Sequence, residues 1–377
     1  RVPVGQLVNT RLSVLAWDDP RATAPLRAAA RRFEALEGIP VDVGARSLAE
    51  FNDEPIERAA ERADLLLLDY PMIPRAAERG ALLPIADTAP ASASPVAAAS
   101  FTWADRTWAL PMDLACQVAA WNVDALEAPP TDWDSVRELA DARPGSVAIA
   151  LFHSDLVCAL LSISAASGWV GPDRLELHVE ALETLLSLAR AVDPALIDVA
   201  PPALLTALAV GGRLAYAPLV FGYARAGRPP SRLRWADAPE GPAGIGSVLG
   251  GAGLAVSART ESAAGARAFA AFCASAAVQE HIVPQEGGQP SAAGAWDDPA
   301  VDAAAGGFYS GTRRSIAAAV RRPSHPSWPD FSLRAGHLLR DAVADGRSAA
   351  AACDALARIA RDLDLPLIHR YERTTAS

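Results

Sequence analysis

Aromatic and acidic side chains follow directly after short apolar runs of this sequence. One such run ends in Trp17-Asp18-Asp19, and a second one ends at Tyr70. Aromatic rings stack on the C–H faces of carbohydrates, while carboxylate, amide and imidazole groups bond to hydroxyl groups. These residue types therefore favour reversible binding of a small polar solute, such as a sugar, a polyol or an organic acid.

Further residues of these kinds, and glycines that expose the backbone, occur at other predicted strand ends and in a glycine-rich stretch. The candidate solute contacts chosen on these grounds are Trp17, Asp18, Asp19, Ser47, Tyr70, His153, Tyr216, Tyr223, Gly250 and Gly251. Most of the side chains also have a structural alternative. An aromatic ring can pack into the core, an aspartate can cap a helix, and a histidine can make a structural hydrogen bond at a cap.

Three arginines are candidate anchors for an acidic solute. Arg21, Arg46 and Arg225 lie near these positions, and a guanidinium group can hold a carboxylate or a phosphate through two parallel hydrogen bonds. An arginine is more often solvated at the surface. The sequence therefore leaves open whether the solute is neutral or an acid.

The sequence lacks the usual catalytic and cofactor-binding patterns. It contains no Gly-x-Ser-x-Gly, HExxH or CxxC motif, and no two of its histidines are spaced i, i+4. The glycines from Gly244 to Gly253 are followed by an extended segment rather than a helix, which disfavours a dinucleotide site. We therefore predict no metal, no cofactor and no catalysis. The neighbouring carboxylates of Asp18 and Asp19 leave a hydrolase as an alternative.

Composition excludes several other classes of protein. All 34 basic residues are arginines, so a P-loop, Schiff-base or kinase lysine is impossible. The net charge of -10 disfavours nucleic-acid binding. A chain of 377 residues that is 51% hydrophobic can form two lobes with ordinary cores. The four cysteines lie far apart in apolar runs, so we expect buried free thiols.

The predicted elements alternate between strands and helices. Strands are predicted at 12–16, 39–43 and 64–69, with helices at 23–37 and 56–62 between them. This order is typical of a parallel α/β sheet, which binds ligands at the carboxyl ends of its strands. The residues after these strands are therefore expected to meet at one edge of the sheet.

A second α/β lobe is predicted further along the chain. Its strands are expected at 146–152, ending at His153, and at 214–219 and 233–237, and residues 175–191 are expected to be helical. The glycine-rich segment 244–257 is expected to return in extended form. Its glycines suit a hinge, because glycine adopts backbone angles that other residues avoid.

The segment from Thr102 to Leu139 contains an ordered set of features that resembles one known family. They are a short hairpin from Trp103 to Trp108, Leu110-Pro111-Met112-Asp113, an extended run to Trp121-Asn122, a proline-rich gap and a helix start at Asp132-Trp133. Further matching motifs are FEALEGIPV at 33–41, ADLLLLD at 63–69, Gly288-Gln289-Pro290 and Arg322-Pro323. This set resembles the family 1 solute-binding proteins of ABC importers, the maltose-binding-protein-like group.

The resemblance implies a two-lobed, type II periplasmic-binding-protein-like fold with discontinuous lobes. Residues 1–113 and 255–308 would form the N-terminal lobe, and residues 114–254 and 309–377 the C-terminal lobe. It also implies that Asp113 and Gln289 contact the solute. The expected mechanism is closure of the lobes about their hinge crossings on a solute in the interlobe cleft.

The resemblance also implies partners and a location. A monomer would carry the solute to the membrane subunits of an ABC importer, with no nucleic acid involved. The given chain starts without the layout of a signal peptide and has no cysteine for a lipid. An extracytoplasmic protein whose leader was removed is therefore expected, and a cytoplasmic sensor of the same fold is the alternative, which the four cysteines favour.

Overall fold

The computed structural model describes residues 11–85, 93–197 and 199–370. The chain forms two compact units, each built from two separate stretches of sequence. Unit 1 comprises the residues up to Leu114 together with Gly251–Val301, and unit 2 comprises Ala115–Gly250 together with the residues from Asp302 onward. The chain therefore passes between the units after Leu114, Gly250 and Val301. The sequence predicts these passages after residues 113, 254 and 308.

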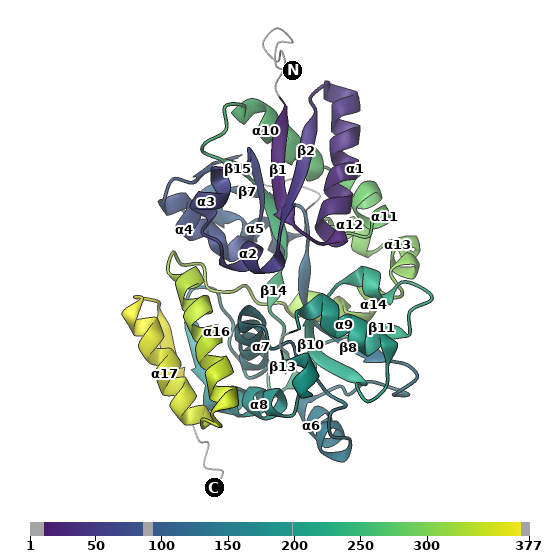
Figure 1. Ribbon diagram of the computed structural model, residues 1–377, viewed down its shortest axis with the longest axis vertical. Coiled ribbons are helices and arrows are strands. Elements are labelled where there is room, and N and C mark those ends of the chain that lie inside the picture. Colours follow the sequence, from purple (N-terminus) through teal and green to yellow (C-terminus); the bar gives the residue numbers. More distant parts are fainter. Residues whose placement is uncertain (1–10, 86–92, 198, 371–377) are drawn as a thin grey trace. The chain divides into compact units, whose positions relative to one another are not determined.

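Unit 1 is built on a six-stranded mixed sheet (Figure 1). Its first three strands are parallel, as the sequence predicts, and the strand that returns late in the chain joins them in antiparallel orientation. The spatial order is β2 (Val41–Arg46), β1 (Leu12–Trp17), β3 (Leu65–Asp69), β15 (Ala252–Ser257) and β4 (Leu82–Leu83), and β7 (Ala109–Pro111) also pairs with β15.

The hydrophobic pattern explains the place of β3 in this sheet. Its four leucines, residues 65–68, are all fully buried. A strand that is apolar on both faces suits the interior of a sheet covered on both sides. The strand β3 therefore lies between β1 and β15 rather than at an edge.

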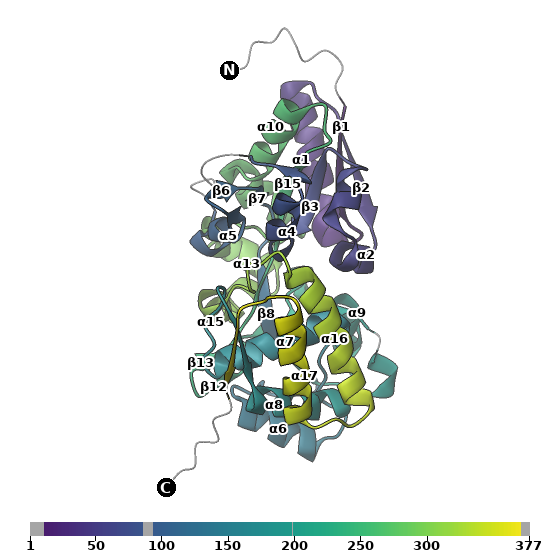
Figure 2. The ribbon, with the colours of Figure 1, turned by 90° about the vertical axis from the view of Figure 1, so that its left-hand side faces the viewer.

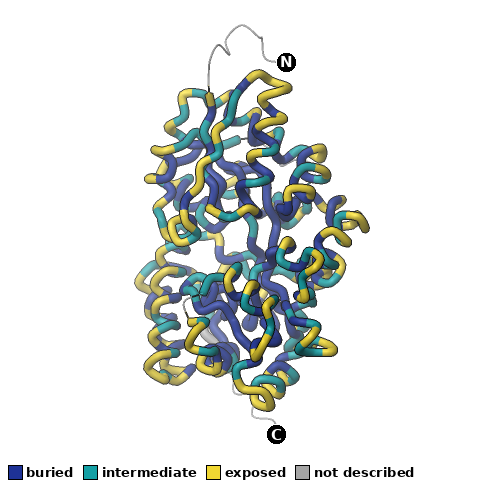
Figure 3. Tube along the Cα trace, turned by 45° about the vertical axis from the view of Figure 1, so that its right-hand side comes forward, coloured by how far each residue is buried: buried dark blue, intermediate teal, exposed yellow. Residues whose placement is uncertain are grey.

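Two long helices of unit 1 pack against each other and against the sheet. They are α1 (Pro20–Glu37) and α10 (Ala263–Cys273), and the rings of Phe33 and Phe269 meet between them at 5.2 Å. The helix α1 ends at Gly38, whose φ of 73° lies in the left-handed region that glycine adopts without strain. The tube in Figure 3 shows the buried strands and the exposed outer turns of these helices.

Short elements complete unit 1. The predicted hairpin is confirmed, with Ala104 and Asp105 both at positive φ in its two-residue turn. The short elements of unit 1 are α2 (Leu48–Asp53), α3 (Ile56–Ala60), a 3-10 turn at Tyr70–Met72, α4 (Ile73–Glu78), α5 (Pro95–Ser100), β5 (Thr102–Trp103), β6 (Arg106–Thr107), a π-helical turn at Val278–Ile282, α11 (Val283–Gln285), α12 (Ala293–Trp296) and α13 (Pro299–Ala304). The last of these runs past Val301.

Unit 2 is built on a smaller antiparallel sheet. The strand β8 (Ala115–Asn122) lies between β10 (Tyr216–Phe221) and β11 (Leu233–Ala236), and β14 (Leu249–Gly250) pairs with the start of β8. Further elements are α6 (Trp133–Ala142), α9 (Pro201–Val210), β12 (Glu240–Gly241), β13 (Gly244–Ile245), α14 (Phe308–Gly311) and α15 (Arg313–Ala318). The predicted helix start is confirmed, because Asp132 caps α6 by accepting from Ser135 N at 2.8 Å.

One sequence-based prediction for unit 2 is wrong, and another is confirmed only in part. Residues 146–152 form only a single parallel bridge, from Val147 to Tyr216, before the chain turns into α7 (His153–Ala166). Residues 175–191 form β9 (Leu175–His178) and then α8 (Val179–Arg190). In the second case a partner distant in sequence decides the structure, because β9 pairs with β16 (Leu367–Arg370).

Four helices pack together in unit 2. The helix α16 (Trp328–Ala344) contacts α7, α8 and α17 (Ala349–Asp362), and Figure 2 shows α16 and α17 side by side. Gly336 of α16 lies so close to the His153 carbonyl that a Cβ atom would overlap it. The glycine therefore permits the close approach of α16 to the start of α7. None of the helices in the described ranges has the length and apolar character needed to cross a membrane.

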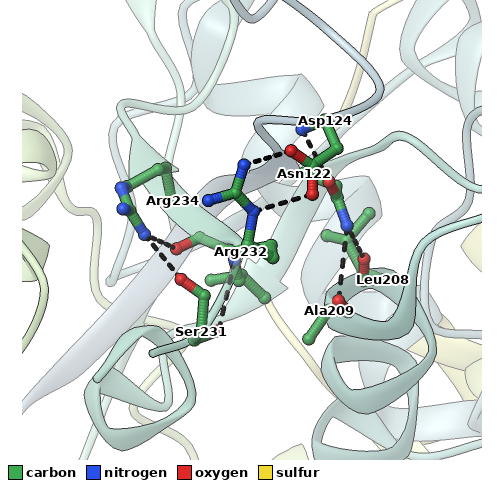
Figure 4. A network of polar contacts seen from close by, with 8 residues as sticks. Asn122, Asp124, Leu208, Ala209, Ser231, Arg232 and Arg234 are labelled. Atoms are coloured by element: carbon green, nitrogen blue, oxygen red, sulfur yellow. Dashed lines mark hydrogen bonds and ion pairs between the residues drawn. The ribbon is translucent and has the colours of Figure 1, made fainter. Parts of the chain in front are cut away.

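A polar network closes the end of β8 (Figure 4). Asn122 Nδ2 donates to Leu208 O at 2.9 Å, and Asn122 Oδ1 accepts from Asp124 N at 2.9 Å. Arg232 binds the Asp124 carboxylate through two nitrogens. The Asn-x-Asp motif at 122–124 therefore ties β8 to α9 and to the residues before β11.

Candidate functional site

The carboxyl ends of β1 and β2 lie side by side in unit 1. Trp17 and Arg46 are register partners in these parallel strands, and Asp18 N donates to Arg46 O at 2.7 Å. The β3 end is next in the sheet, and Tyr70 follows it directly. This edge is where a parallel α/β sheet usually binds its ligand.

A buried ion pair connects this edge to the candidate Asp113. Arg21 Nε donates to Asp113 Oδ2 at 2.8 Å, and Arg21 Nη2 contacts the other carboxylate oxygen. Burial raises the pKa of Asp113, and the neighbouring Arg21 opposes this effect. The Arg21 guanidinium also lies 5.9 Å from the centre of the Trp17 ring. Arg21, a candidate anchor for an acidic solute, thus has its Nε and Nη2 edge engaged by a carboxylate of the protein itself.

The backbone around Asp113 holds two further candidates close to it. Asp113 N donates to Ala252 O at 2.9 Å, and Ala252 N donates back to Asp113 O at 3.0 Å. Gly251 has a φ of 126°, and a Cβ atom there would lie 2.5 Å from Asp113 O, so only glycine fits. Leu114 N donates to Gln289 O at 3.1 Å, and Gln289 Nε2 donates to Leu114 O at 3.1 Å. The structure thus brings Asp113, Gly251 and Gln289 together.

The remaining polar candidates of unit 1 divide into helix caps and one exposed acid. Asp19 accepts from Arg21 N at 2.7 Å and caps α1, which is the structural alternative for this residue. Ser47 caps α2 in a capping box with Glu50. Asp18, directly before Asp19, is exposed.

The aromatic candidates of unit 1 are both buried. The Trp17 side chain is 5% exposed and its ring centre lies 5.0 Å from that of Phe51. Tyr70 is also buried and meets Phe101 edge-on at 6.4 Å. Arg46 is buried beside Trp17, where its Nη1 donates to Glu54 Oε2 at 2.9 Å. Arg46 is therefore not one of the solvated surface arginines, which is the alternative that the sequence leaves open for it.

In unit 2, His153 is the first residue of α7, not the end of a strand as predicted. Its buried ring stacks on that of His337 at 5.0 Å and lies 4.2 Å from Phe152. Burial raises the pKa of Asp155, in the first turn of α7, to about 7, although His153 and Arg322 favour its charged form. The start of α7 therefore gathers titratable groups beneath α16.

The other candidates of unit 2 lie in or beside its sheet. Tyr216 is fully buried, and its hydroxyl donates to Pro130 O at 3.3 Å, so it takes the packing role that the sequence leaves open. Tyr223 follows β10 and is also buried. A Cβ atom at Gly250 would lie 2.6 Å from the ring of Phe221, which shows how closely that ring packs on β14.

Sequence reasoning missed the partners that organise the edge of unit 1. Asp113 and Arg21 are separated by 92 positions, and neither periodicity nor a motif links them. The aromatic partner Phe51 lies in a short helix that is not predicted. Among the residues described, no group of three or more histidine, cysteine, aspartate or glutamate side chains could hold a metal ion.

Comparisons with known proteins agree with this architecture. Residues 28–306 match a family model described as bacterial extracellular solute-binding protein. An ABC transporter solute-binding protein of Thermotoga lettingae, bound with α-D-tagatose, is 19% identical, with a TM-score of 0.81 over 94% of this chain and 100% of that one. The maltose-bound MalE3 of T. maritima is 17% identical, with a TM-score of 0.77 over 94% and 99%.

A third solved structure has the same fold. It is an ABC transporter solute-binding protein of Agrobacterium radiobacter K84 in complex with ribitol, 16% identical, with a TM-score of 0.76 over 94% of this chain and 99% of that chain. Comparison with the curated proteins gives no match. The predicted two-lobed solute-binding fold is confirmed by these structures. Since the family model spans more than half of the sequence, the chain belongs to the bacterial extracellular solute-binding proteins.

Proposed function

We propose that this protein reversibly binds a sugar, a polyol or a closely related acid and delivers it to the membrane subunits of an ABC importer. The observation that carries the proposal is the match of residues 28–306 to the extracellular solute-binding family. Proteins of the same fold were solved with tagatose, maltose and ribitol. We infer that this chain takes a solute of similar size and polarity.

The edge of unit 1 supports this function. The ring of Trp17 and the backbone around Gly251 and Gln289 lie beside the Arg21–Asp113 pair. These are the group types that bind carbohydrates. Asp18, Ser47, Tyr70, His153, Tyr223 and Gly250 stay proposed contacts. Closure of the lobes on the solute remains a prediction from the sequence.

We infer that the protein releases its solute without chemical change. The alternative of a hydrolase depended on the pair Asp18 and Asp19. Asp19 Oδ1 is engaged by the α1 backbone at Arg21 N, so this acid has a structural role. A catalytic pair would need both carboxylates to face the reacting bond.

We also propose that the protein works outside the cytoplasm as a monomer. The family described by the matching model is an extracellular one. The four cysteines favoured the alternative of a cytoplasmic sensor, but all four are buried. Burial raises the pKa of the Cys116 thiol to about 12, which suppresses its reactive thiolate form. Such cysteines are compatible with an oxidising compartment.

Isothermal titration calorimetry with a panel of monosaccharides, disaccharides and polyols tests the proposal. We expect saturable binding of at least one compound with one site per chain, and chromatography after prolonged incubation should recover that compound intact. Absence of binding across neutral and acidic members of the panel would contradict the proposed solute class. Conversion of the bound compound would favour the hydrolase alternative.

A further inference from the structure

Three buried N–H donors at the edge of unit 1 have no acceptor within the part of the chain that the structure describes. They are Nε and Nη2 of Arg46 and Nε1 of Trp17. The Arg46 side chain is 1% exposed and the Trp17 residue is 5% exposed, so bulk water does not satisfy these groups. Native proteins rarely leave buried donors without an acceptor, and several at one place require a specific explanation.

These donors belong to a single cluster. Trp17 and Arg46 are register partners at the ends of β1 and β2. Both pack on Phe51, whose ring centre lies 5.0 Å from the Trp17 ring and 5.4 Å from the Arg46 guanidinium carbon. Phe51 offers no conventional acceptor. A group that entered beside this ring could therefore accept from both residues.

The free edge of Arg46 has the geometry of a carboxylate fork. Its Nη1 is engaged by Glu54, which leaves Nε and Nη2, the pair of donors that can form two parallel bonds to one carboxylate. The same pair on Arg21 binds both oxygens of Asp113. Arg21, whose guanidinium lies 5.9 Å from the centre of the Trp17 ring, thus makes the carboxylate contact that Arg46 does not make.

Arg46 shares the carboxylate of Glu54 with a second arginine. Glu54 Oε2 accepts from Arg62 at 2.5 Å as well as from Arg46, so one carboxylate oxygen serves two guanidinium groups. Glu50 also lies near, but its carboxylate is turned to Ser47, from which it accepts at the backbone and the hydroxyl. The charges of Arg46 and Arg62 are thus balanced by Glu54 and Glu50, so a further carboxylate would be held by the free donors of Arg46 rather than by an excess of positive charge.

We propose that Arg46 and Trp17 bind a carboxylate of the solute, so that the transported compound is a sugar acid, such as an aldonic or uronic acid, rather than a neutral sugar. This inference rests on the proposed function and narrows its substrate class. The donors are covered in the structure, so the carboxylate reaches them when α2, which carries Phe51, shifts. Ser47, directly after Arg46 at the start of α2, is exposed.

Matched pairs of compounds test the inference by titration calorimetry on the full chain. The pairs are glucose and glucuronate, glucitol and gluconate, and ribitol and ribonate. We expect the acid of at least one pair to bind at least tenfold more tightly than its neutral partner. Arg46→Gln should remove this preference, leaving the two members within about threefold, because the variant lacks the charge and the fork.

A matched control is available in the neighbouring arginine. Arg62 shares Glu54 with Arg46 but its side chain is 47% exposed, so Arg62→Gln should keep the preference for the acid. If Arg46→Gln does not fold, Trp17→Phe keeps an aromatic ring and removes one donor, and should weaken acid binding several-fold while changing binding of the neutral partner little. Circular dichroism confirms the fold of each variant.

Each outcome decides between the two proposals. If the neutral member of every pair binds as tightly as the acid or more tightly, the carboxylate site is overturned, and water is then the acceptor at Arg46. The proposed function is not affected by this result. A preference for the acid that survives Arg46→Gln and Trp17→Phe also overturns the carboxylate site. Binding of no member of any pair contradicts this inference and counts against the proposed function, whose wider panel then decides.

Discussion

Arg21 and Asp113 show how one residue can acquire its role from a partner far away in the sequence. Arg21 alone is a candidate anion anchor, and Asp113 alone is a candidate solute contact. In the structure the two side chains bind each other, with Nε and Nη2 of Arg21 on the two carboxylate oxygens of Asp113. The motifs around them predict where each residue lies, but not that the two side chains meet. The sequence could therefore predict the polar edge of unit 1 but not its internal pairing.

Replacement of Asp113 should destabilise unit 1. Asp113→Asn leaves the Arg21 charge buried without its counter-ion, and breaking a buried pair in this way costs about 3–5 kcal/mol. We expect a loss of this order in the free energy of unfolding measured with urea. Asp42→Asn is the control, because the Arg11–Asp42 pair is more than 60% exposed on both sides and such pairs contribute about 1 kcal/mol or less. Equal effects of the two changes would contradict a buried pair.

Gly251 should tolerate no side chain. Gly251→Ala adds a Cβ atom at a φ of 126° and within 2.5 Å of Asp113 O, so the backbone must move. We expect a loss of about 1–3 kcal/mol in unfolding free energy from the strained backbone alone, and weaker solute binding. Gly44→Ala provides the comparison, because Gly44 has an ordinary φ and its nearest neighbour is 3.7 Å away. If Gly251→Ala leaves the unfolding free energy and solute binding unchanged, the turn can adapt to a side chain.

At the scale of elements, local signals predict some structures well and others poorly. The cap at Asp132, the hairpin after Trp103 and the leucine-rich β3 carry their own turn or burial pattern, and all three are confirmed. Residues 146–152 are a short apolar run, and residues 175–178 are only the four residues Leu-Glu-Leu-His, so periodicity alone cannot assign either segment. The structure that each segment adopts depends on a partner distant in the sequence, which is Tyr216 for the first segment and β16 for the second.

The start of α7 should make the stability of unit 2 dependent on pH. Burial raises the pKa of Asp155 in the folded protein to about 7, against about 3.9 for an unperturbed aspartate. Between these values the folded protein keeps a proton that the unfolded chain has lost. The Asp155 contribution to stability is therefore full below pH 4 and is lost as the pH rises through 7.

Asp155→Asn should remove this dependence. We expect the variant and the parent protein to have similar stability near pH 4, and the variant to be more stable at pH 8 by up to about 4 kcal/mol. Thermal unfolding followed by circular dichroism at several pH values measures the difference. A difference that stays constant from pH 4 to pH 8 would mean that Asp155 titrates at its ordinary value.

At the scale of the whole molecule, the order of strands and helices and a set of spaced motifs were enough to predict the family and its two discontinuous units. They do not name a solute, because recognition depends on a few side chains whose contacts come from different stretches of sequence. Arg46 illustrates the limit. Only its burial and its unfilled donors, both invisible in the sequence, distinguish it from an ordinary surface arginine.

Solute binding should stabilise the whole protein. A compound that binds only the folded state at a concentration of 100 times its Kd adds about 2.7 kcal/mol of stability. We expect a clear rise in Tm with the cognate solute in differential scanning fluorimetry, growing with the logarithm of its concentration. A stereoisomer that shows no heat in calorimetry serves as the control. A Tm that does not move with the cognate solute would show that it binds folded and unfolded chains alike.

The position of β15 in unit 1 has a consequence for biosynthesis. This strand, residues Ala252–Ser257, pairs with β3, β4 and β7, all of which the ribosome makes much earlier. Until it emerges, the nascent chain holds a leucine-rich strand with an unpaired edge, which invites aggregation. We therefore expect the sheet of unit 1 to be completed only after residues Ala252–Ser257 have emerged from the ribosome.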